Sequence, residues 1–225
     1  MDLARLLTGF EAPDLVDVGH CQLEKRSAAA FSQLQQAGKA AGFDLRLVSG
    51  YRSFQRQLLI WNGKLTGLRP VFDAAMCRVD LQQLSGFAKL EAVLLYSALP
   101  GGSRHHWGTD LDLYDAAAVP AVYQPQLLAS EYLPGGPFAA ANAWLNQYAG
   151  QYGFFRPYQR YCGGVAAEPW HFSFQPMASD YLQQFQPQML HAALQNAEVI
   201  EKDLILQHLP IIFDRYIRTI CEEIL

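Results

Sequence analysis

The sequence predicts a globular protein that combines α-helices with a few short β-strands. The chain has 225 residues, of which 51% are hydrophobic, enough for one well-packed domain or for a domain with a helical extension. Short segments that alternate polar and apolar residues are typical of half-buried strands. Longer segments with apolar residues at intervals near 3.6 are typical of helices that pack on a core.

The N-terminal region predicts two helices followed by a strand. Residues 1–22 are expected to form a short helix and a loop that Pro13 interrupts. Residues 23–41 carry apolar side chains at helical spacing, and Gly42 is a natural end for this helix. Residues 43–47 alternate apolar and charged side chains and predict a strand.

The next part of the chain predicts two helices with a loop between them. Ser53 is a suitable N-cap for a helix over residues 54–62. Residues 63–80 contain glycines and a proline with little periodicity, so we expect a loop that lines a cleft. Residues 81–98 have an amphipathic helical pattern, which Pro100-Gly101-Gly102 brings to an end.

A second strand is predicted where polar and apolar residues alternate over residues 109–114. Leu111 and Leu113 are expected to face the core. Asp110 and Asp112 then face the opposite way, toward a cleft. Gly108 allows a sharp turn just before this strand.

The rest of the chain predicts one more strand and several helices. Residues 115–137 are expected to form a loop and residues 138–150 a helix. Around residue 172 the alternation places His171 and Ser173 on one face of a strand, with the aromatic residues Trp170, Phe172 and Phe174 on the other. Residues 176–225 predict two or three helices with a break at Pro210, and no chemistry is visible in them. We therefore expect a main domain over residues 1–175 and a helical extension over residues 176–225.

The charge and hydropathy of the chain argue against nucleic-acid binding and against a transmembrane helix. The formal net charge is −4 and no basic run occurs, which argues against nucleic acid as a partner. No apolar run approaches the ~20 residues that a transmembrane helix needs. The N-terminus is too short and too acidic for a signal peptide, so we expect a cytoplasmic protein if the chain is complete, and a periplasmic or cell-envelope protein if a leader was trimmed.

The four cysteines, Cys21, Cys77, Cys162 and Cys221, show neither zinc-knuckle nor redox-motif spacing. We expect reduced thiols in a reducing compartment, and disulfides remain open if the protein is exported.

Two stretches supply the ligands of a catalytic zinc site. Ser103–Asp112 carries adjacent histidines and two aspartates, and Glu168-Pro169-Trp170-His171 adds a histidine and a glutamate. Catalytic zinc is held by three nitrogen or oxygen ligands and keeps a fourth position for water. We predict His105, Asp112 and His171 as ligands and Glu168 as the base that deprotonates this water.

Spacing alone leaves two of these ligands open. His106 competes with His105, and Asp110 shares the strand face of Asp112. Asp110 is alternatively a partner that orients a ligating histidine. A structural zinc site would be closed by four protein ligands, so three ligands and a spare glutamate favour catalysis.

The two stretches resemble the VanY-type D-alanyl-D-alanine carboxypeptidases among the LAS zinc peptidases. The family pattern of Ser-x-His, Gly, Asp and later Glu-x-Trp-His is met at Ser103, His105, Gly108, Asp112, Glu168, Trp170 and His171. A third match is Ser49-Gly50-Tyr51-Arg52-Ser53, followed by Gln57. The resemblance covers roughly residues 43–175, and its register selects His105 and Asp112.

The resemblance implies an α+β fold, in which a small antiparallel sheet carries the zinc site and helices flank it. It implies that Arg52 holds the substrate carboxylate or the developing oxyanion, since a guanidinium binds a carboxylate with two parallel hydrogen bonds. It also implies that Gln57 and Ser103 contact the substrate. The expected function is a zinc-dependent carboxypeptidase that removes the terminal D-alanine from peptidoglycan stem peptides or muropeptides.

Other functions remain compatible with the same motifs. Within the same chemistry they are an L,D-carboxypeptidase acting on tetrapeptides, a D-Ala-D-Ala dipeptidase and a peptidoglycan endopeptidase. These enzymes differ in cleft shape rather than in motif. A non-enzymatic alternative is a module that keeps the metal and binds stem peptides without cleaving them.

Overall fold

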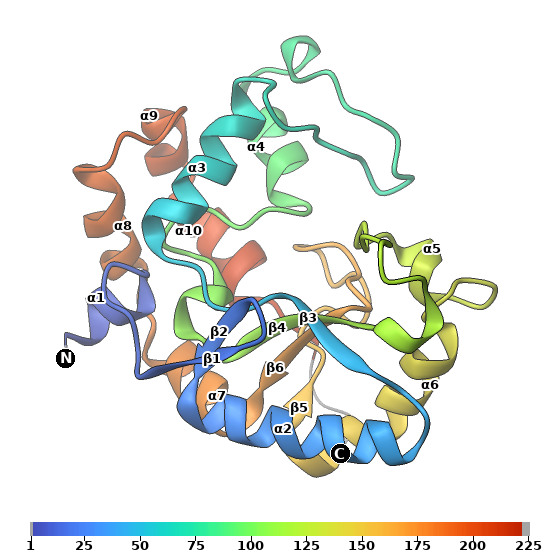
Figure 1. The fold of residues 1–225 in the computed structure, drawn as a ribbon. Helices are drawn as coiled ribbons and strands as arrows, with labels where there is room; N and C mark the ends of the chain where they lie inside the picture. The colour runs from blue at the N-terminus through green and yellow to red at the C-terminus, as the bar shows by residue number, and fades with distance from the viewer. Residues whose placement is uncertain (1, 222–225) are drawn as a thin grey trace.

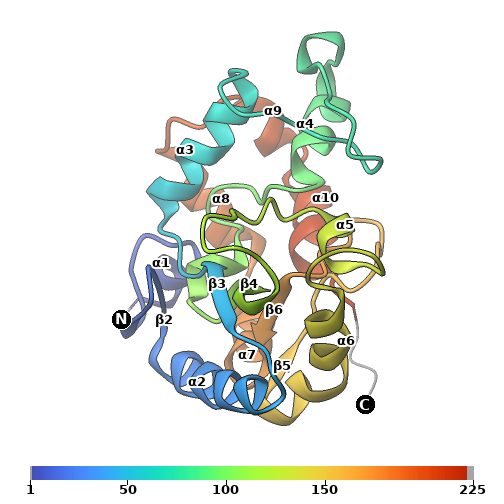
Figure 2. The ribbon, with the colours of Figure 1, turned by 45° about the vertical axis from the view of Figure 1, so that its right-hand side comes forward.

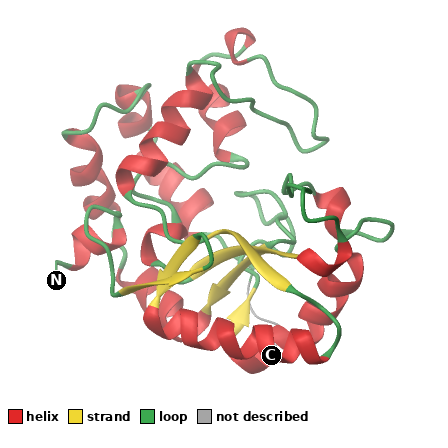
Figure 3. Cartoon of the chain, viewed as in Figure 1, coloured by secondary structure: helices red, strands yellow, loops and turns green. Residues whose placement is uncertain are grey.

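A four-stranded antiparallel sheet forms the centre of the molecule (Figures 1 and 3). The computed structural model describes residues 2–221. The sheet order is β3-β4-β6-β5. The strands are β3 (Leu45–Ser49), β4 (Asp110–Asp115), β6 (His171–Phe174) and β5 (Phe154–Phe155). This small sheet among helices confirms the predicted α+β class.

Strand β4 alternates as predicted. Leu111 and Leu113 are buried in an aliphatic and aromatic core on one face of the sheet. Asp110 and Asp112 point to the opposite face, because successive side chains of a strand alternate. In the β4–β6 register, Asp112 is directly opposite His171, so the two segments with candidate ligands become neighbours.

Helices cover the apolar face of the sheet and bury the core. They are α2 (Lys25–Ala40), α6 (Ala139–Tyr148) and the 3-10 turn η4 (Ala149–Tyr152), seen below the sheet in Figure 1. Phe31 and Leu34 of α2 and Leu145 of α6 contribute to this core. The sheet is thereby held from the side opposite the aspartates.

A second core lies among helices from the N-terminal half of the chain and helices that follow the sheet. Its helices lie beyond the other face of the sheet (Figures 1 and 2). They include α1 (Leu3–Leu7), α3 (Phe54–Leu65), α4 (Gly86–Leu94), α8 (Pro187–Gln195), α9 (Lys202–Gln207), α10 (Leu209–Phe213) and the π-helical turn η5 (Asp214–Arg218). Leu190, Ile205 and Ile212 of the C-terminal helices share this core with Trp61 of α3. The division at residue 175 stays a prediction.

The N-terminal region differs from its prediction. Beyond helix α1, it forms a β-hairpin of β1 (Leu15–Val18) and β2 (Cys21–Glu24). A two-residue turn joins the strands, and Gly19 there has a φ of +63°, which a hairpin turn of this length requires. The helix predicted from residue 23 begins at Lys25, because the Glu24 carboxylate accepts hydrogen bonds from the Arg26 and Ser27 amides and caps it.

The helix predicted over residues 81–98 is shorter and interrupted. A 3-10 turn, η1 (Leu81–Gln83), precedes α4, because Leu84 and Ser85 are extended. The loop predicted over residues 115–137 contains the 3-10 turn η3 (Ala116–Ala118) and the short helix α5 (Ala129–Tyr132). The Tyr132 hydroxyl donates to the Leu113 carbonyl at 3.0 Å, a tertiary contact that local pattern does not reveal.

The C-terminal segment has more and shorter helices than the two or three predicted. Helix α7 (Gln175–Gln184) follows β6 directly, and α8 to α10 and η5 come after it. Pro187 and Pro210 each lie in the first turn of a helix, where a missing amide hydrogen costs nothing. Within residues 2–221, no helix combines the length and the hydrophobicity needed to cross a bilayer.

Candidate metal centre and active site

His105 lies in the 3-10 turn η2 (Arg104–Trp107), immediately before β4. Gly108 ends this turn with a φ of +69°, and a Cβ atom there would lie 2.9 Å from the Glu24 amide nitrogen. Glycine is therefore required both by the backbone conformation and by the close approach of β2. This turn brings His105 over the polar face of β4, as the sequence predicts.

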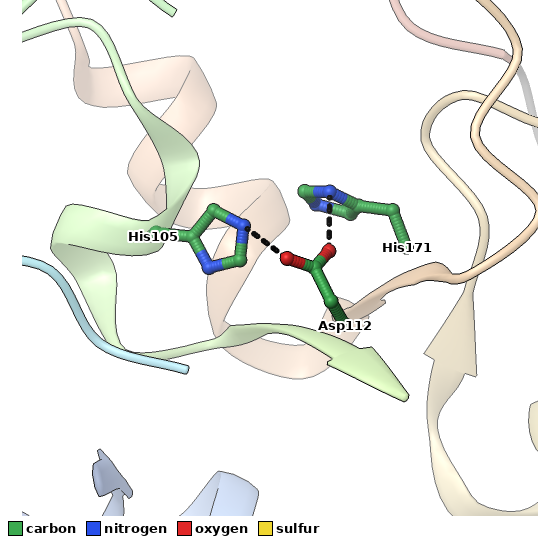
Figure 4. Close-up of side chains that lie close together, drawn as sticks. All are labelled: His105, Asp112 and His171. Carbon is green, nitrogen blue, oxygen red and sulfur yellow. Dashed lines mark ion pairs between the residues drawn. The ribbon is translucent and has the colours of Figure 1, made fainter. Parts of the chain in front are cut away.

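The ring of His105 has a defined orientation. Its Nδ1 atom lies 2.8 Å from the Gly50 carbonyl oxygen, which accepts only if Nδ1 carries the proton. Nε2 is then the atom with a lone pair, and it lies 3.5 Å from Asp112 Oδ2 (Figure 4). Burial lowers the pKa of His105 to about 3, with the Arg52 charge adding to this effect, so the ring is neutral at pH 7.

His171 is oriented by Asp110. The Nε2 atom of His171 lies 2.9 Å from Asp110 Oδ2, which leaves Nδ1 to face Asp112 Oδ1 at 3.3 Å (Figure 4). A carboxylate that holds the far nitrogen of a ligating histidine is a frequent feature of metal sites. Asp110 thus occupies the position of an orienting partner, one of the two roles that spacing left open.

Asp110 is part of a buried network. Arg104 Nε donates to its Oδ2 at 2.8 Å, and the hydroxyls of Ser173 and Thr109 donate to its Oδ1 at 2.7 and 2.9 Å. Burial by itself would raise the pKa of Asp110, but the charges of Arg104 and His171 outweigh burial and lower it. Asp110 is therefore ionised, and both of its carboxylate oxygens have hydrogen-bond partners.

The three candidate ligands have the spacing of a metal site. Their ligand atoms lie within 4.8 Å of one another, in the part of the chain the structure describes. Zinc bonds to nitrogen and oxygen measure about 2.0–2.2 Å, so two ligands of a tetrahedral zinc lie about 3.4 Å apart. The two ligand pairs that meet at Asp112, at 3.5 and 3.3 Å, match this separation.

The charge of the site also fits a cation. Asp112 Oδ1 is buried and accepts no hydrogen bond from the described residues. Burial alone would lower the pKa of His171, but Asp110, Asp112 and Glu168 raise it well above its usual value. The carboxylates of the site favour positive charge, which a proton on His171 supplies and which a divalent cation would also supply. Two imidazoles and a carboxylate are a donor set that zinc prefers.

Glu168 lies beside the ligands rather than among them. Its Oε2 atom is 3.1 Å from His171 Nδ1, and burial raises the pKa of its carboxyl. The His171 amide donates to the Glu168 carbonyl at 3.1 Å across Pro169, so the chain bends here instead of continuing β6. This bend lets the carboxylate of Glu168 turn toward the site.

Arg52 reaches the site from the turn between β3 and α3. Its Nη2 atom lies 3.4 Å from Asp112 Oδ2, and its side chain is 23% exposed. The Arg52 Nη1 atom donates to Gln57 Oε1 at 3.1 Å, and Gln57 Nε2 donates to the Ala98 carbonyl at 2.8 Å. Gln57 is fully buried and does not line the cavity beside the candidate ligands, so it reaches the site only through its hydrogen bond with Arg52. A direct contact between Gln57 and a substrate stays a prediction.

The candidate ligands lie in the wall of a cavity of about 230 Å³. Ser103 lines it as well, together with Arg52, Glu168 and the three candidate ligands. Phe72 and Met76 of the loop over residues 63–80 contribute to the wall, which confirms that this loop lines the cleft. A second cavity of about 770 Å³ shares Arg52, Asp112 and Leu127 with the first, so the cleft continues past Arg52 toward the β1–β2 hairpin.

Several wall residues have no signal in the sequence. Tyr158 lines the cavity with its ring 5.0 Å from that of His171, and Tyr96 and Leu127 lie elsewhere in the wall. Tyr51, Tyr114 and Tyr161 do not line this cavity. Tyr158, Tyr96 and Leu127 join the wall because loops that are distant in the sequence meet there, which local sequence patterns do not reveal.

His106 has a structural position. Its Nδ1 atom lies 2.6 Å from the Arg52 carbonyl oxygen, and its Nε2 accepts from the Gly101 amide at 3.1 Å. Both ring nitrogens are therefore used by backbone groups, while the ring of His105 faces Asp112.

Trp170 corrects one expectation about this region. It packs against Tyr132 and Phe138, in a cluster separate from Phe172 and Phe174, because β6 begins only at His171.

Comparison with known proteins assigns the chain to a family. The sequence model of the VanY family, D-alanyl-D-alanine carboxypeptidase, matches residues 20–177. An uncharacterised protein of Haemophilus influenzae (strain Rd) is 34% identical over 121 residues, which are 53% of this chain and 92% of that protein. The chain therefore belongs to the VanY family of D-alanyl-D-alanine carboxypeptidases. VanY-family peptidases are hydrolases.

Solved structures share this fold. VanYB in complex with D-alanine-D-alanine superposes with a TM-score of 0.52 at 21% identity, covering 83% of this chain and 91% of that one. The LdcB LD-carboxypeptidase gives 0.53 at 21% identity, covering 79% and 81%. A variant of the vancomycin-resistance D,D-pentapeptidase VanY in complex with Zn(II) gives 0.51 at 20% identity, covering 76% and 85%.

Proposed function

We propose that this protein is a zinc-dependent carboxypeptidase that removes the terminal D-alanine from peptidoglycan stem peptides. The observation that carries the proposal is the convergence of His105 Nε2, Asp112 and His171 Nδ1 beside a buried glutamate. The donor set suits zinc, and a VanY variant of the same fold is complexed with Zn(II).

His105, Asp112 and His171 would hold the zinc ion. The chemistry that zinc would supply there is that of a Lewis acid, which would polarise a peptide carbonyl and lower the pKa of a water to about 7. Glu168 takes the proton of the attacking water and returns it to the leaving amine, for which its raised pKa suits it.

Arg52 and Ser103 orient the substrate. The guanidinium of Arg52 is held by Gln57 and Ser49, so its position is set before a substrate arrives. It binds the substrate's terminal carboxylate or the oxyanion with two parallel hydrogen bonds. Ser103 lines the same cavity and offers a hydroxyl to the substrate.

The dimensions of the cleft suit a small terminal residue. The cavity of about 230 Å³ at the candidate ligands accommodates a D-alanine. The adjoining cavity of about 770 Å³ leaves room for the remaining stem peptide. VanYB binds D-alanine-D-alanine and LdcB is an LD-carboxypeptidase, so the experiment must separate these two specificities.

The test is amino-acid release by the zinc-loaded protein from three soluble substrates, each with and without a chelator. The first is a muropeptide pentapeptide ending in D-Ala-D-Ala, the second a tetrapeptide, and the third the pentapeptide with an amidated C-terminus. We expect chelator-sensitive D-alanine from the pentapeptide and no cleavage of the amidated form.

The other outcomes are equally informative. Release from the tetrapeptide alone would assign L,D-carboxypeptidase activity in place of the proposed one. Equal cleavage of the amidated peptide would indicate an endopeptidase, and D-alanyl-D-alanine as the product would indicate a dipeptidase. Binding of all three without turnover would indicate a stem-peptide-binding module.

A further inference from the structure

Two cysteines far apart in the sequence are in contact at the C-terminal end of the described chain. The Sγ atoms of Cys162 and Cys221 lie 3.4 Å apart, although 59 positions separate the two residues in the sequence. Cys221 is buried, with 4% of its surface exposed, whereas Cys162 is half-buried. The other two cysteines are Cys21 and Cys77, of which Cys77 is exposed.

The backbone around the pair is already fixed by other contacts. The Cys221 amide donates to the Pro157 carbonyl at 2.7 Å, and the Arg160 amide lies 3.4 Å from Cys221 Sγ. Nearby, Arg215 Nε donates to the Gly163 carbonyl at 3.0 Å. The segment from Arg215 to Cys221 therefore runs along the loop over residues 157–164 in a defined position.

The same loop continues into the active site. Tyr158 lines the cavity, and its carbonyl accepts a hydrogen bond from the Glu168 amide at 2.8 Å. Gly164 packs so closely on Arg215 that a Cβ atom at residue 164 would lie against the Arg215 carbonyl oxygen. A link between Cys162 and Cys221 would thus restrain the loop that holds Tyr158 and Glu168.

We propose that Cys162 and Cys221 are a redox-active pair that a low-molecular-weight disulfide, such as oxidised glutathione, converts into a disulfide bond. A disulfide needs sulfurs about 2.0 Å apart, and the two thiols already touch. The bond fastens the C-terminal segment to the loop that leads to Glu168. This inference stands independently of the substrate and of the metal.

The reaction is two successive thiol–disulfide exchanges. The half-buried Cys162 loses its proton and attacks one sulfur of oxidised glutathione, which forms a mixed disulfide and releases one glutathione thiolate. Cys221 then loses its proton and attacks Cys162 Sγ, which forms the Cys162–Cys221 bond and releases the second glutathione. The two cysteines lose two electrons, glutathione disulfide gains them, and the two protons end on the two glutathione thiols.

The environment sets the conditions for this exchange. The hydrogen bond with Cys221 raises the pKa of the Cys162 thiol, and the Arg160 guanidinium, 3.4 Å from Cys162 Sγ, opposes this effect. Exchange is therefore faster above neutral pH, where more of the thiolate is present. The test is run at pH 8 for this reason.

The experiment compares the full chain before and after incubation with oxidised glutathione. We expect free thiols to fall from four to two. Mass spectrometry of a non-reduced digest should show one peptide pair, linked through Cys162 and Cys221. Because the bond closes a long loop of the unfolded chain, the melting temperature should rise by about 5–15 °C, and a reductant should reverse this rise.

Matched variants make the result specific. Cys77→Ser changes an exposed cysteine outside the pair and should keep both the link and the melting-temperature shift. Cys162→Ser should lose both and keep three thiols, and because Cys162 is half-buried this variant should fold. A link between another pair would overturn the proposal. So would a stable glutathione adduct on Cys162 with Cys221 still free.

Discussion

The Nε2 atom of His171 lies 2.9 Å from Asp110 Oδ2, and this contact decides which ring nitrogen faces the site. Asp110 is itself held by Arg104 and by the hydroxyls of Ser173 and Thr109. The orientation of one candidate ligand thus depends on a buried network that includes none of the other ligands.

Replacing Asp110 by asparagine should weaken metal binding. The amide keeps the shape of the carboxylate but lacks its charge, so it holds the proton on His171 Nε2 less firmly. We expect zinc affinity to fall by about 10–100-fold, measured by competition with a chromogenic chelator. Asp180→Asn, at an exposed position, is the control and should leave affinity unchanged. An Asp110→Asn protein that folds and binds zinc like the wild type would remove the orienting role of Asp110.

Replacing Glu168 by glutamine should separate metal binding from turnover. Glutamine is nearly the same size but cannot accept the proton of water, so we expect kcat to fall by about 10²–10⁴-fold. Zinc affinity should change only a few-fold, because Glu168 lies outside the ligand triad. Release of D-alanine and the chelator competition are measured on the same preparation. Near-normal turnover would show that another group takes the proton.

Replacing Arg52 by lysine should show whether substrate binding needs the two parallel hydrogen bonds that a guanidinium can make. Lysine keeps the charge but cannot make two parallel hydrogen bonds. We expect kcat/KM for the pentapeptide to fall by about 10²–10³-fold. Arg26→Lys, an exposed arginine on α2, serves as the control. If Arg52→Lys loses no more activity than this control, the proposal that Arg52 anchors the substrate is wrong.

The neighbouring histidines should give opposite phenotypes. His105→Leu removes a lone pair that faces Asp112, so we expect zinc binding to be lost while the protein still folds. His106→Leu leaves the Arg52 carbonyl and the Gly101 amide without partners, and should cost about 1–3 kcal/mol of unfolding free energy. Denaturant unfolding and zinc titration of both variants check this, with the exposed His191→Leu as reference. The reverse pattern would exchange the roles of the two residues.

The sequence by itself determined three of the four strands of the central sheet, the types of the candidate ligands and the family. The alternation of β4 separates Leu111 and Leu113 from Asp110 and Asp112, because side chains of a strand must point to opposite faces. The combined motifs from Arg52 to His171 were specific enough to indicate the VanY family, which the family match confirms.

The tertiary structure decided what depends on contacts between distant segments. The β1–β2 hairpin was missed because its strands are only four residues long, too short for a clear alternation, although Leu23, Val16 and Val18 pack against the sheet core. The broken helix at Leu84 and the separate cluster around Trp170 were missed because packing, not local spacing, sets them.

The same holds within the site. Which of His105 and His106 faces Asp112 depends on the Gly50, Arg52 and Gly101 backbone, which sequence spacing does not place. The wall formed by Tyr158 and Leu127, and the contact between Cys162 and Cys221, likewise exist only once separate loops meet. Periodicity follows from the geometry of a single chain segment, whereas hydrogen-bond partners and burial follow from how segments pack against one another.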